Sequence, residues 1–349
     1  MKYYVPNMEL VGALKFVKQL DETSVETSVE DETEVTFDFS HMSNFDPLPM
    51  LIMGSAMKNY RHRYPDIPFY ISGTDSAGKG YAGTMGFFKY ISKSLGIGKM
   101  PGEATGSSNY IPITPIVINE LQQEEFQQGN YLALGDIIEK ESGRLARIVD
   151  RGNPELHKLL TYLIREIIRN TPEHAKTDTV WVCGQYWPSY ELAEIAIADE
   201  GIGIYNSIIQ NPAHRSYITD NVLSLKWALK AGISEAFRPS AKQRSNDEWA
   251  NSGFGLYMVS EICRHLNGSF CIISYGNYIL IDNHGVSEGE TAYKGTAIRM
   301  RVPSKRISSA QEIINRIASQ GENEARTIRN AFIKASTPSK GLMTELNID

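Results

Sequence analysis

The strongest hydrophobic pattern in the chain lies between residues 155 and 170. It consists of leucines and isoleucines spaced three, four and seven residues apart: Leu156, Leu159, Leu160, Leu163, Ile164, Ile167 and Ile168. This spacing places them on one side of an α-helix and predicts a helix with a single buried face. Apolar and polar residues then alternate in residues 179–187 and 191–198, with the turn-forming Pro188 and Ser189 between the two runs. That pattern predicts an antiparallel hairpin.

A long polar insert follows the hairpin, at residues 205–252. Beyond it, the apolar pattern predicts a helix at 255–266 and extended segments at 269–282 and 295–302. This order of elements predicts an α/β domain at about residues 141–305. Residues 306–349 are expected to be a helical tail of mixed charge, which would pack on that domain or on a second copy of the chain.

Short strands and helices also alternate in the N-terminal part of the chain. Strand-like runs occupy residues 36–39, 68–73 and 111–119, and helical patterns occupy residues 48–63 and 80–98. This alternation predicts a small α/β domain at about residues 1–140. Residues 21–35 contain seven acids and no base, which predicts a solvated loop or an edge strand. Residues 130–136 are expected to be extended.

Composition and charge exclude several classes of protein. The 349 residues are 42% hydrophobic and 22% charged, which suffices for a sizeable core and excludes a disordered chain. The formal net charge of -6 provides no overall field that would attract nucleic acid. The widely spaced Cys183, Cys263 and Cys271 fit neither a disulfide framework nor a zinc site. Because no stretch is apolar enough for a membrane span, we expect a soluble cytoplasmic protein with no membrane partner.

Four short motifs carry candidate chemistry. Glu166 and Asn170 are four residues apart on the predicted helix, so both project from one face. Residues 199–203 (Asp-Glu-Gly-Ile-Gly) end a strand with a carboxylate and two glycines. Residues 251–256 (Asn-Ser-Gly-Phe-Gly-Leu) open a helix, whose free N–H groups favour phosphate. Residues 294–296 (Lys-Gly-Thr) add a hydroxyl before the last strand.

In this order the four motifs resemble those of the GHKL ATPase superfamily, which includes gyrase, heat-shock chaperone, histidine kinase and MutL ATPases. The resemblance covers roughly residues 150–303 and implies an α+β sandwich, the Bergerat fold, with a mixed sheet and a helical layer. REIIRNTPEHA resembles the N-box. It implies that Asn170 holds Mg²⁺ against the triphosphate of ATP and that Glu166 orients or deprotonates an attacking water. Both roles suit the chemistry, because an amide oxygen can ligate Mg²⁺ and a carboxylate can accept a proton.

The remaining motifs resemble the nucleotide-binding boxes of that superfamily. IADEGIG resembles the G1 box, which implies that Asp199 accepts a hydrogen bond from the adenine amino group while Gly201 and Gly203 keep the pocket floor thin. Thr296 would support Asp199 and the base through a water. SGFGL resembles the G2 box and implies a phosphate site. The residues implied for phosphate are Ser252, Gly253, Phe254, Gly255 and Leu256.

The position of the insert at 205–252 suits an ATP lid, since long inserts in compact domains are often lids. Within it, Arg238, Lys242 and Arg244 either reach phosphate after closure or form a solvated cluster. Residues 73–80 nearly match a second phosphate motif, GxxxxGK[ST], but Gly80 replaces the hydroxyl that would ligate Mg²⁺. We interpret residues 73–80 as a flexible loop.

The motifs also bear on the kind of family member. None of the seven histidines lies in the H-[ED]-x-x-x-P pattern of sensor histidine kinases. With Glu166 at the first position of the N-box, the motif resembles that of the hydrolysing members or of the anti-sigma-type serine kinases. We predict a Mg²⁺-dependent ATPase that acts as a nucleotide-gated switch for a protein client and could form a homodimer. The alternatives are a serine/threonine kinase acting in trans and a non-catalytic nucleotide-binding interaction module.

Residues 35–60 faintly resemble STAS domains, the partners of such serine kinases. Pro47 and Leu48 stand after Asp46, where phosphorylatable relatives carry serine or threonine. Phosphorylation in cis at this spot is therefore excluded, and a STAS-like fold would serve protein contact.

Overall fold

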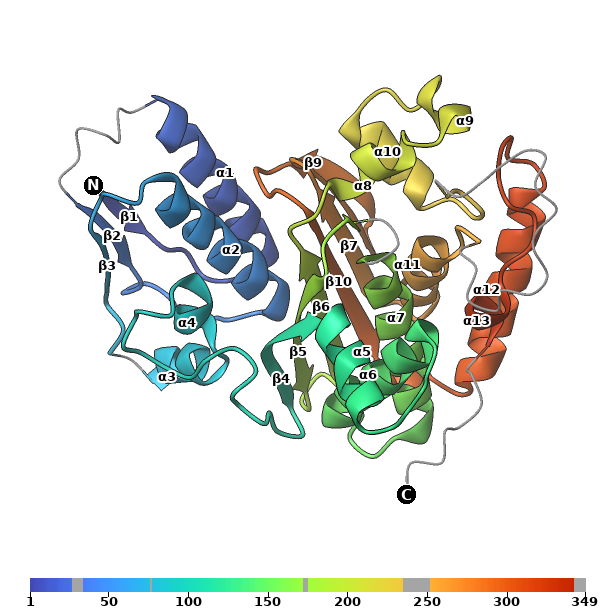
Figure 1. The fold of residues 1–349 in the computed structure, drawn as a ribbon, viewed down its shortest axis with the longest axis horizontal. Coiled ribbons are helices and arrows are strands. Elements are labelled where there is room, and N and C mark those ends of the chain that lie inside the picture. The colour runs from blue at the N-terminus through green and yellow to red at the C-terminus, as the bar shows by residue number, and fades with distance from the viewer. Residues whose placement is uncertain (27–33, 76, 172–174, 235–251, 342–349) are drawn as a thin grey trace.

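The computed structural model describes residues 1–26, 34–75, 77–171, 175–234 and 252–341, which form two packed units (Figure 1). The first unit holds a parallel sheet in the order β1-β2-β3, made of β1 (Lys2–Tyr4), β2 (Val35–Asp38) and β3 (Phe69–Ser72). Its helices are α1 (Leu10–Glu26), α2 (Pro47–Arg63), α3 (Ala77–Thr84) and α4 (Phe87–Ile91). The strands and helix expected at residues 36–73 are therefore present. The STAS likeness is not confirmed.

The second unit is built on a seven-stranded sheet in the order β4-β5-β6-β10-β7-β8-β9. Its strands are β4 (Tyr110–Val117), β5 (Thr179–Trp187), β6 (Leu192–Asp199), β7 (Ser269–Ser274), β8 (Asn277–Asp282), β9 (Gly285–Glu290) and β10 (Thr296–Pro303). Where a mixed sheet was expected, all neighbouring pairs of strands in this sheet are antiparallel. The predicted hairpin of β5 and β6 is confirmed.

A helical layer covers one face of this sheet and makes the expected α+β sandwich (Figure 1). The helices on this side of the sheet are α5 (Ile118–Gln127), α6 (Leu134–Val149), α7 (Pro154–Asn170), α8 (Gly203–Ile208), α9 (Pro212–Arg215), α10 (Asn221–Ala228), α11 (Gly255–His265), α12 (Ala310–Ala325) and α13 (Thr337–Lys340). Helix α12 packs on α7 and α11, farther from the sheet (Figure 1). The leucine and isoleucine stripe of α7 packs into the core beneath this layer. Asn153 caps the start of this helix, because its side chain accepts hydrogen bonds from the N–H groups of Glu155 and Leu156.

The first unit packs on the opposite face of the same sheet. Successive residues of β6 show this directly, because Ile195 and Ile197 join the core under the helical layer while Ala196 and Ala198 join the core shared with the first unit. Helix α2 lies in that second core and is buried along most of its length. The central strands are thus buried on both faces, which fixes their position relative to both units.

A partly buried ion cluster also joins the two units. Arg301 donates to Glu194, through Nε at 2.5 Å, and to Asp46, through Nη2 at 2.9 Å. The N–H of Leu48, at the start of α2, donates to Glu194 at 3.3 Å. Burial and the nearby charge of Glu194 raise the pKa of Asp46 to about 6.

Three local expectations were incomplete or wrong. Residues 21–26 belong to helix α1 and not to a loop or edge strand, since its apolar residues Val17 and Leu20 anchor the helix in the core. Helix α6 already begins at Leu134, within the run expected to be extended. Strand β9, which is largely exposed, lacked the apolar alternation by which a strand is recognised. The boundary near residue 140 stays a prediction, although β4 pairs with β5 of the second unit.

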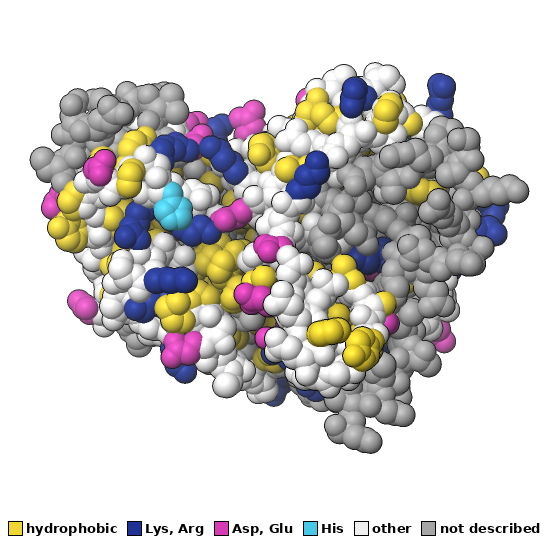
Figure 2. Space-filling view, viewed as in Figure 1, with side chains coloured by type: hydrophobic (Ala, Val, Ile, Leu, Met, Phe, Trp, Pro, Cys, Tyr) yellow, Lys and Arg dark blue, Asp and Glu magenta, His cyan; other side chains and the backbone are white. Residues whose placement is uncertain are grey.

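The three cysteines are buried and free, as expected. Among the described helices, none has both the length and the apolar character needed to cross a bilayer. Figure 2 shows basic and acidic side chains interspersed on the visible face of the described residues.

Candidate nucleotide-binding site

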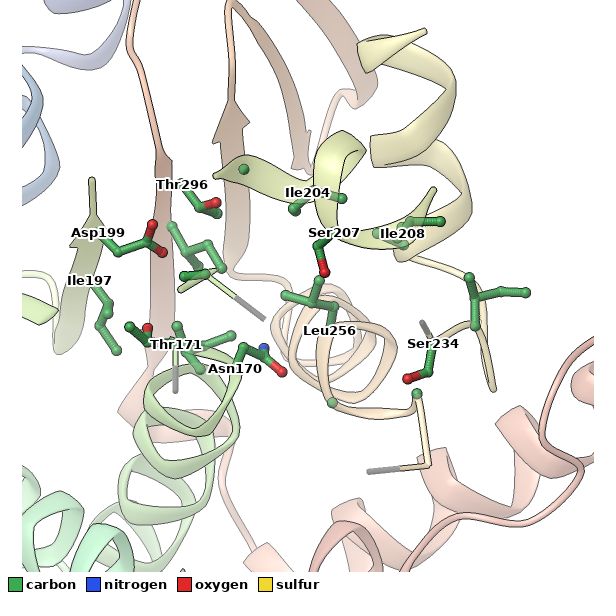
Figure 3. Close-up of a pocket in the computed structure, with 18 residues that line it drawn as sticks. Asn170, Thr171, Ile197, Asp199, Ile204, Ser207, Ile208, Ser234, Leu256 and Thr296 are labelled. Carbon is green, nitrogen blue, oxygen red and sulfur yellow. The ribbon is translucent and has the colours of Figure 1, made fainter. Parts of the chain in front are cut away.

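A pocket, with about 800 Å³ of free space that includes open solvent, lies beside the ends of α7 and β6 and the starts of β10 and α11 (Figure 3). It is lined by Ile167, Asn170, Thr171, Ala175, Ile197, Asp199, Gly203, Ile204, Ser207, Ile208, Ala228, Ile233, Ser234, Gly253, Gly255, Leu256, Thr296 and Ile298. The pocket thus brings together residues from all four sequence motifs.

Asp199 is the buried carboxylate of the pocket and the last residue of β6. It pairs across the sheet with Thr296, the first residue of β10 (Figure 3). Its Oδ1 accepts a hydrogen bond from the N–H of Gly201 at 2.8 Å. Burial raises the pKa of Asp199 to about 6, although this backbone hydrogen bond works in the opposite direction. An adenine amino group could supply a donor to this largely desolvated carboxylate.

The two glycines after Asp199 have different surroundings. Gly203 lines the pocket with a φ of +75°, and a Cβ there would stand 2.5 Å from the ring of Tyr275. Gly201 does not line the pocket, because its backbone packs against Ala175, whose carbonyl oxygen would lie 2.2 Å from a Cβ. Gly201 was expected to keep the pocket floor thin beneath a ligand. Instead, the lack of a side chain at Gly201 makes room for the backbone of Ala175.

The start of α11 forms the pocket wall next to the end of α7. Gly253, Gly255 and Leu256 line the pocket there. The first N–H groups of a helix are free to bind an anion such as phosphate. Ser252 and Phe254 do not line it: Ser252 accepts a hydrogen bond from the N–H of Ser336 at 3.0 Å, and Phe254 is fully buried in the core. They hold the turn whose glycines face the pocket.

Asn170 ends helix α7 and faces the pocket (Figure 3). Its Nδ2 is buried and has no hydrogen-bond partner within the described residues. Among those residues, no cluster of three acids, histidines or cysteines could hold a metal. Mg²⁺ commonly takes only one or two protein ligands and completes its shell with phosphate oxygens and water. The Oδ1 of Asn170 therefore fits a Mg²⁺ ion that arrives with a triphosphate.

Glu166 lies one helical turn before Asn170 and does not line the pocket. It is fully buried, and its Oε1 accepts from Nη2 of Arg165 at 2.9 Å. Its Oε2 lies 3.6 Å from Nη2 of Arg169 and accepts from Oγ of Ser339 at 3.4 Å. Burial opposes ionisation, but the charges of Arg169 and Arg165 outweigh it and hold the pKa of Glu166 below its usual range. Glu166 is therefore a carboxylate at neutral pH.

Gly255 lies between the Glu166 carboxylate and the pocket at the start of α11. A Cβ added at Gly255 would stand 3.0 Å from Oε2 of Glu166 and 3.9 Å from Oδ1 of Asn170. Because Gly255 itself lines the pocket, no side chain at this position intervenes between the pocket wall and the carboxylate. A phosphate at the start of α11 would thus lie close to Glu166.

The insert at 205–252, expected as a lid, supplies one wall of the pocket through Ser207, Ile208, Ala228, Ile233 and Ser234. The basic residues Arg238, Lys242 and Arg244 lie outside the described residues. Residues 77–80, which were expected to belong to a flexible loop, form the start of helix α3. None of the described residues in 73–80 lines the pocket. Ser207 and Ser234 were not predicted as site residues, because serines in a polar insert carry no distinctive pattern. The apolar Ile197 and Ile298 could have been found from the alternation in their strands.

Residues 155–306 match the family model described as Histidine kinase-, DNA gyrase B-, and HSP90-like ATPase. No curated protein matches the chain.

Proposed function

We propose that residues 155–306, which match the GHKL-type ATPase family model, bind ATP with Mg²⁺ in the pocket of Asp199 and Asn170 and hydrolyse it. One observation carries the proposal: Asn170, Asp199, Gly253 and Thr296, which are separated by up to 126 positions in the sequence, line a single pocket. Adenine would bind at Asp199, and the phosphates would extend toward the start of α11.

In this proposal each group has a distinct role. Asp199 accepts from the adenine amino group, and its partner across the sheet, Thr296, supports that contact. The N–H groups at Gly253 and Gly255 bind phosphate oxygens, because a helix start favours negative charge. Oδ1 of Asn170 ligates Mg²⁺, which would neutralise charge on the phosphates. Glu166 orients the group that attacks the γ-phosphorus and accepts its proton.

We further propose that nucleotide binding is transmitted to the first unit, which would contact the protein client. Glu200 follows Asp199 directly, and α2 holds it through Nζ of Lys58 at 2.6 Å and Oγ of Ser55 at 2.7 Å. Movement at Asp199 would therefore pull on α2. This contact supports a switch in which ATP changes the population of client-binding states.

Titration with a non-hydrolysable ATP analogue, with and without Mg²⁺, tests the proposal. Asp199→Asn removes the charge and offers a donor where adenine needs an acceptor. We expect it to weaken binding by about 1.5–3 kcal/mol, or roughly ten- to a hundredfold. Asp66→Asn, an exposed change in the first unit, serves as the control and should leave binding unchanged. An Asp199→Asn variant that binds as tightly as the parent chain would refute the adenine site.

A second candidate function is phosphoryl transfer to a serine or threonine hydroxyl. The observation that favours it is the hydrogen bond from the hydroxyl of Ser339 to Glu166. Labelled ATP distinguishes the candidates: free phosphate supports hydrolysis and labelled protein supports transfer. Binding without either product would favour the non-catalytic interaction module.

A further inference from the structure

The segment from Ser336 to Gly341 is seated on the carboxylate of Glu166. Ser339 lies on the short helix α13 and is fully buried. Its hydroxyl donates to Oε2 of Glu166 at 3.4 Å, and its carbonyl accepts from the hydroxyl of Tyr162 at 3.0 Å. Ser339 is 173 positions away from Glu166 in sequence, so only the fold brings the two together.

The carboxylate that Ser339 contacts is itself held in one orientation. Arg165 donates to Oε1 of Glu166 through both Nε, at 3.2 Å, and Nη2, at 2.9 Å. Arg165 also donates to Glu139 at 2.8 Å and to the carbonyl of Pro338 in the same segment. An activated nucleophile commonly consists of a hydroxyl that is hydrogen-bonded to a base, with a third group that orients the base. Here these groups are Ser339, Glu166 and Arg165. Hydrogen bonds in such arrangements are often longer before the reactant is bound.

This hydroxyl also lies near the phosphate end of the pocket. Oε2 of Glu166, which accepts from Ser339, would lie 3.0 Å from a Cβ at the pocket-lining Gly255. Ser252, at the same turn, accepts a hydrogen bond from the N–H of Ser336. The segment is therefore fastened to both elements that would surround the γ-phosphate, α7 and the start of α11.

We infer that Ser339 is an internal phosphoacceptor, which receives the γ-phosphoryl group of ATP bound in the adjacent pocket. The inference rests on the proposed ATP site. Oγ of Ser339 forms a bond to the γ-phosphorus, and the bond from that phosphorus to the β,γ-bridging oxygen breaks. ADP leaves with the electron pair, and the hydroxyl proton passes to Oε2 of Glu166. The products are ADP and phosphoserine at position 339.

The neighbouring serines provide an internal comparison. The hydroxyl of Ser336 donates to Ser339 at 3.1 Å and lies 3.4 Å from that of Ser252. Among the described serines, Ser339 is the one whose hydroxyl contacts Glu166. Ser336→Ala therefore removes a buried hydroxyl of the same segment without removing the nucleophile, which makes it the matched control.

The test incubates the full chain with ATP and Mg²⁺ and maps phosphorylation by mass spectrometry. We expect one phosphoryl group per chain, on Ser339, at a first-order rate independent of protein concentration. Ser339→Ala should lose it and Glu166→Gln should lower its rate at least tenfold, whereas Ser336→Ala and Ser339→Thr should retain a phosphorylated residue. Thermal unfolding of each variant verifies that the fold persists.

Binding of the non-hydrolysable analogue, measured on the same samples, separates this inference from the proposed function. Chains that bind the analogue but carry no phosphate on residue 339 would overturn the inference and leave the ATP site standing. Phosphate on Ser336, or a rate that rises with protein concentration, would overturn it as well. Absence of analogue binding would refute both.

Discussion

Asp199 and Thr296 face one another across the antiparallel pair of β6 and β10, where both strands border the pocket. Because β6 ends at this residue and β10 begins at its partner, two motifs 97 positions apart in sequence meet at one point. The carboxylate is buried among apolar neighbours such as Ile197 and Ile298. In this environment the ionised form of Asp199 is stabilised only by the few hydrogen-bond donors that reach the carboxylate.

We expect ATP affinity to fall as the pH falls through about 6. The pKa of Asp199 is about 6 in the free protein, and the adenine amino group binds the ionised form. Affinity should be constant above about pH 7 and should then decline by up to tenfold per pH unit. The phosphates of ATP titrate in the same pH range. The Asp199→Asn variant lacks the carboxyl group but binds the same ATP, so its pH profile shows the contribution of the phosphates alone and serves as the reference. Equal pH profiles for the two proteins would contradict the assignment.

Asp199 should affect the stability of the nucleotide-free protein in the opposite direction, so that stability decreases as the pH rises. Because the pKa of Asp199 is raised in the folded chain, its contribution to stability is fully present below its unfolded pKa, about 4. That contribution is lost as the pH rises through about 6. Nucleotide binding should offset this loss, so the stabilisation by ATP analogue in thermal unfolding should be larger at pH 8 than at pH 5.5.

Glu166→Gln should spare nucleotide binding and abolish turnover, since a neutral amide cannot accept the proton. The variant should also be less stable by about 3 kcal/mol, because two arginines lose a buried carboxylate. Measurement combines analogue titration, phosphate release and thermal unfolding.

Glu261→Gln is the matched control for that variant. Glu261 also pairs with an arginine three residues away, but on the exposed face of α11. The Glu261→Gln substitution should lower the free energy of unfolding by less than about 1 kcal/mol and leave turnover unchanged. Normal turnover by Glu166→Gln would remove Glu166 from its proposed role.

Gly253→Ala should weaken both the fold and ATP binding. Gly253 has a φ of +69°, and a Cβ would stand 2.5 Å from the carbonyl oxygen of Ile233. Strain in this backbone region costs about 1–3 kcal/mol and would displace the N–H groups at the start of α11. Gly80→Ala, where a Cβ meets nothing within 4 Å, is the control for chemical denaturation and analogue titration. Equal midpoints and affinities for both variants would contradict the prediction.

Lys58→Ala tests the proposed connection between the pocket and the first unit. The Lys58 ammonium pairs with Glu200 at 2.6 Å and lies over the rings of Tyr90 and Trp181. Its loss should cost about 1–2 kcal/mol and abolish any nucleotide-dependent change in hydrogen exchange of α2. Lys15→Ala, an exposed change on α1, should alter neither quantity. If α2 responds to nucleotide equally in Lys58→Ala and the parent chain, transmission does not pass through Glu200.

Much of the second unit follows from local sequence. The stripe of α7, the hairpin of β5 and β6, and the glycines that open α11 each depend on the spacing of a few neighbouring residues. Resemblance to the GHKL motifs then implied which residues would gather around a nucleotide. Of those, Asn170, Asp199, Gly203, Gly253, Gly255, Leu256 and Thr296 line the pocket, whereas Glu166, Gly201, Ser252 and Phe254 support it from outside.

The sequence alone thus determined the strongly periodic elements and the motif residues, because helix and strand periods and motif spacing are short-range properties. Only the tertiary structure decided that Ser339 rests on Glu166 and that Lys58 holds Glu200. Each of these contacts joins residues more than 140 positions apart, and neither has a periodic signature. Their formation depends on how whole helices pack on the two faces of one sheet. Burial of Ser339 and Glu166 also strengthens a hydrogen bond that would contribute little between solvated side chains.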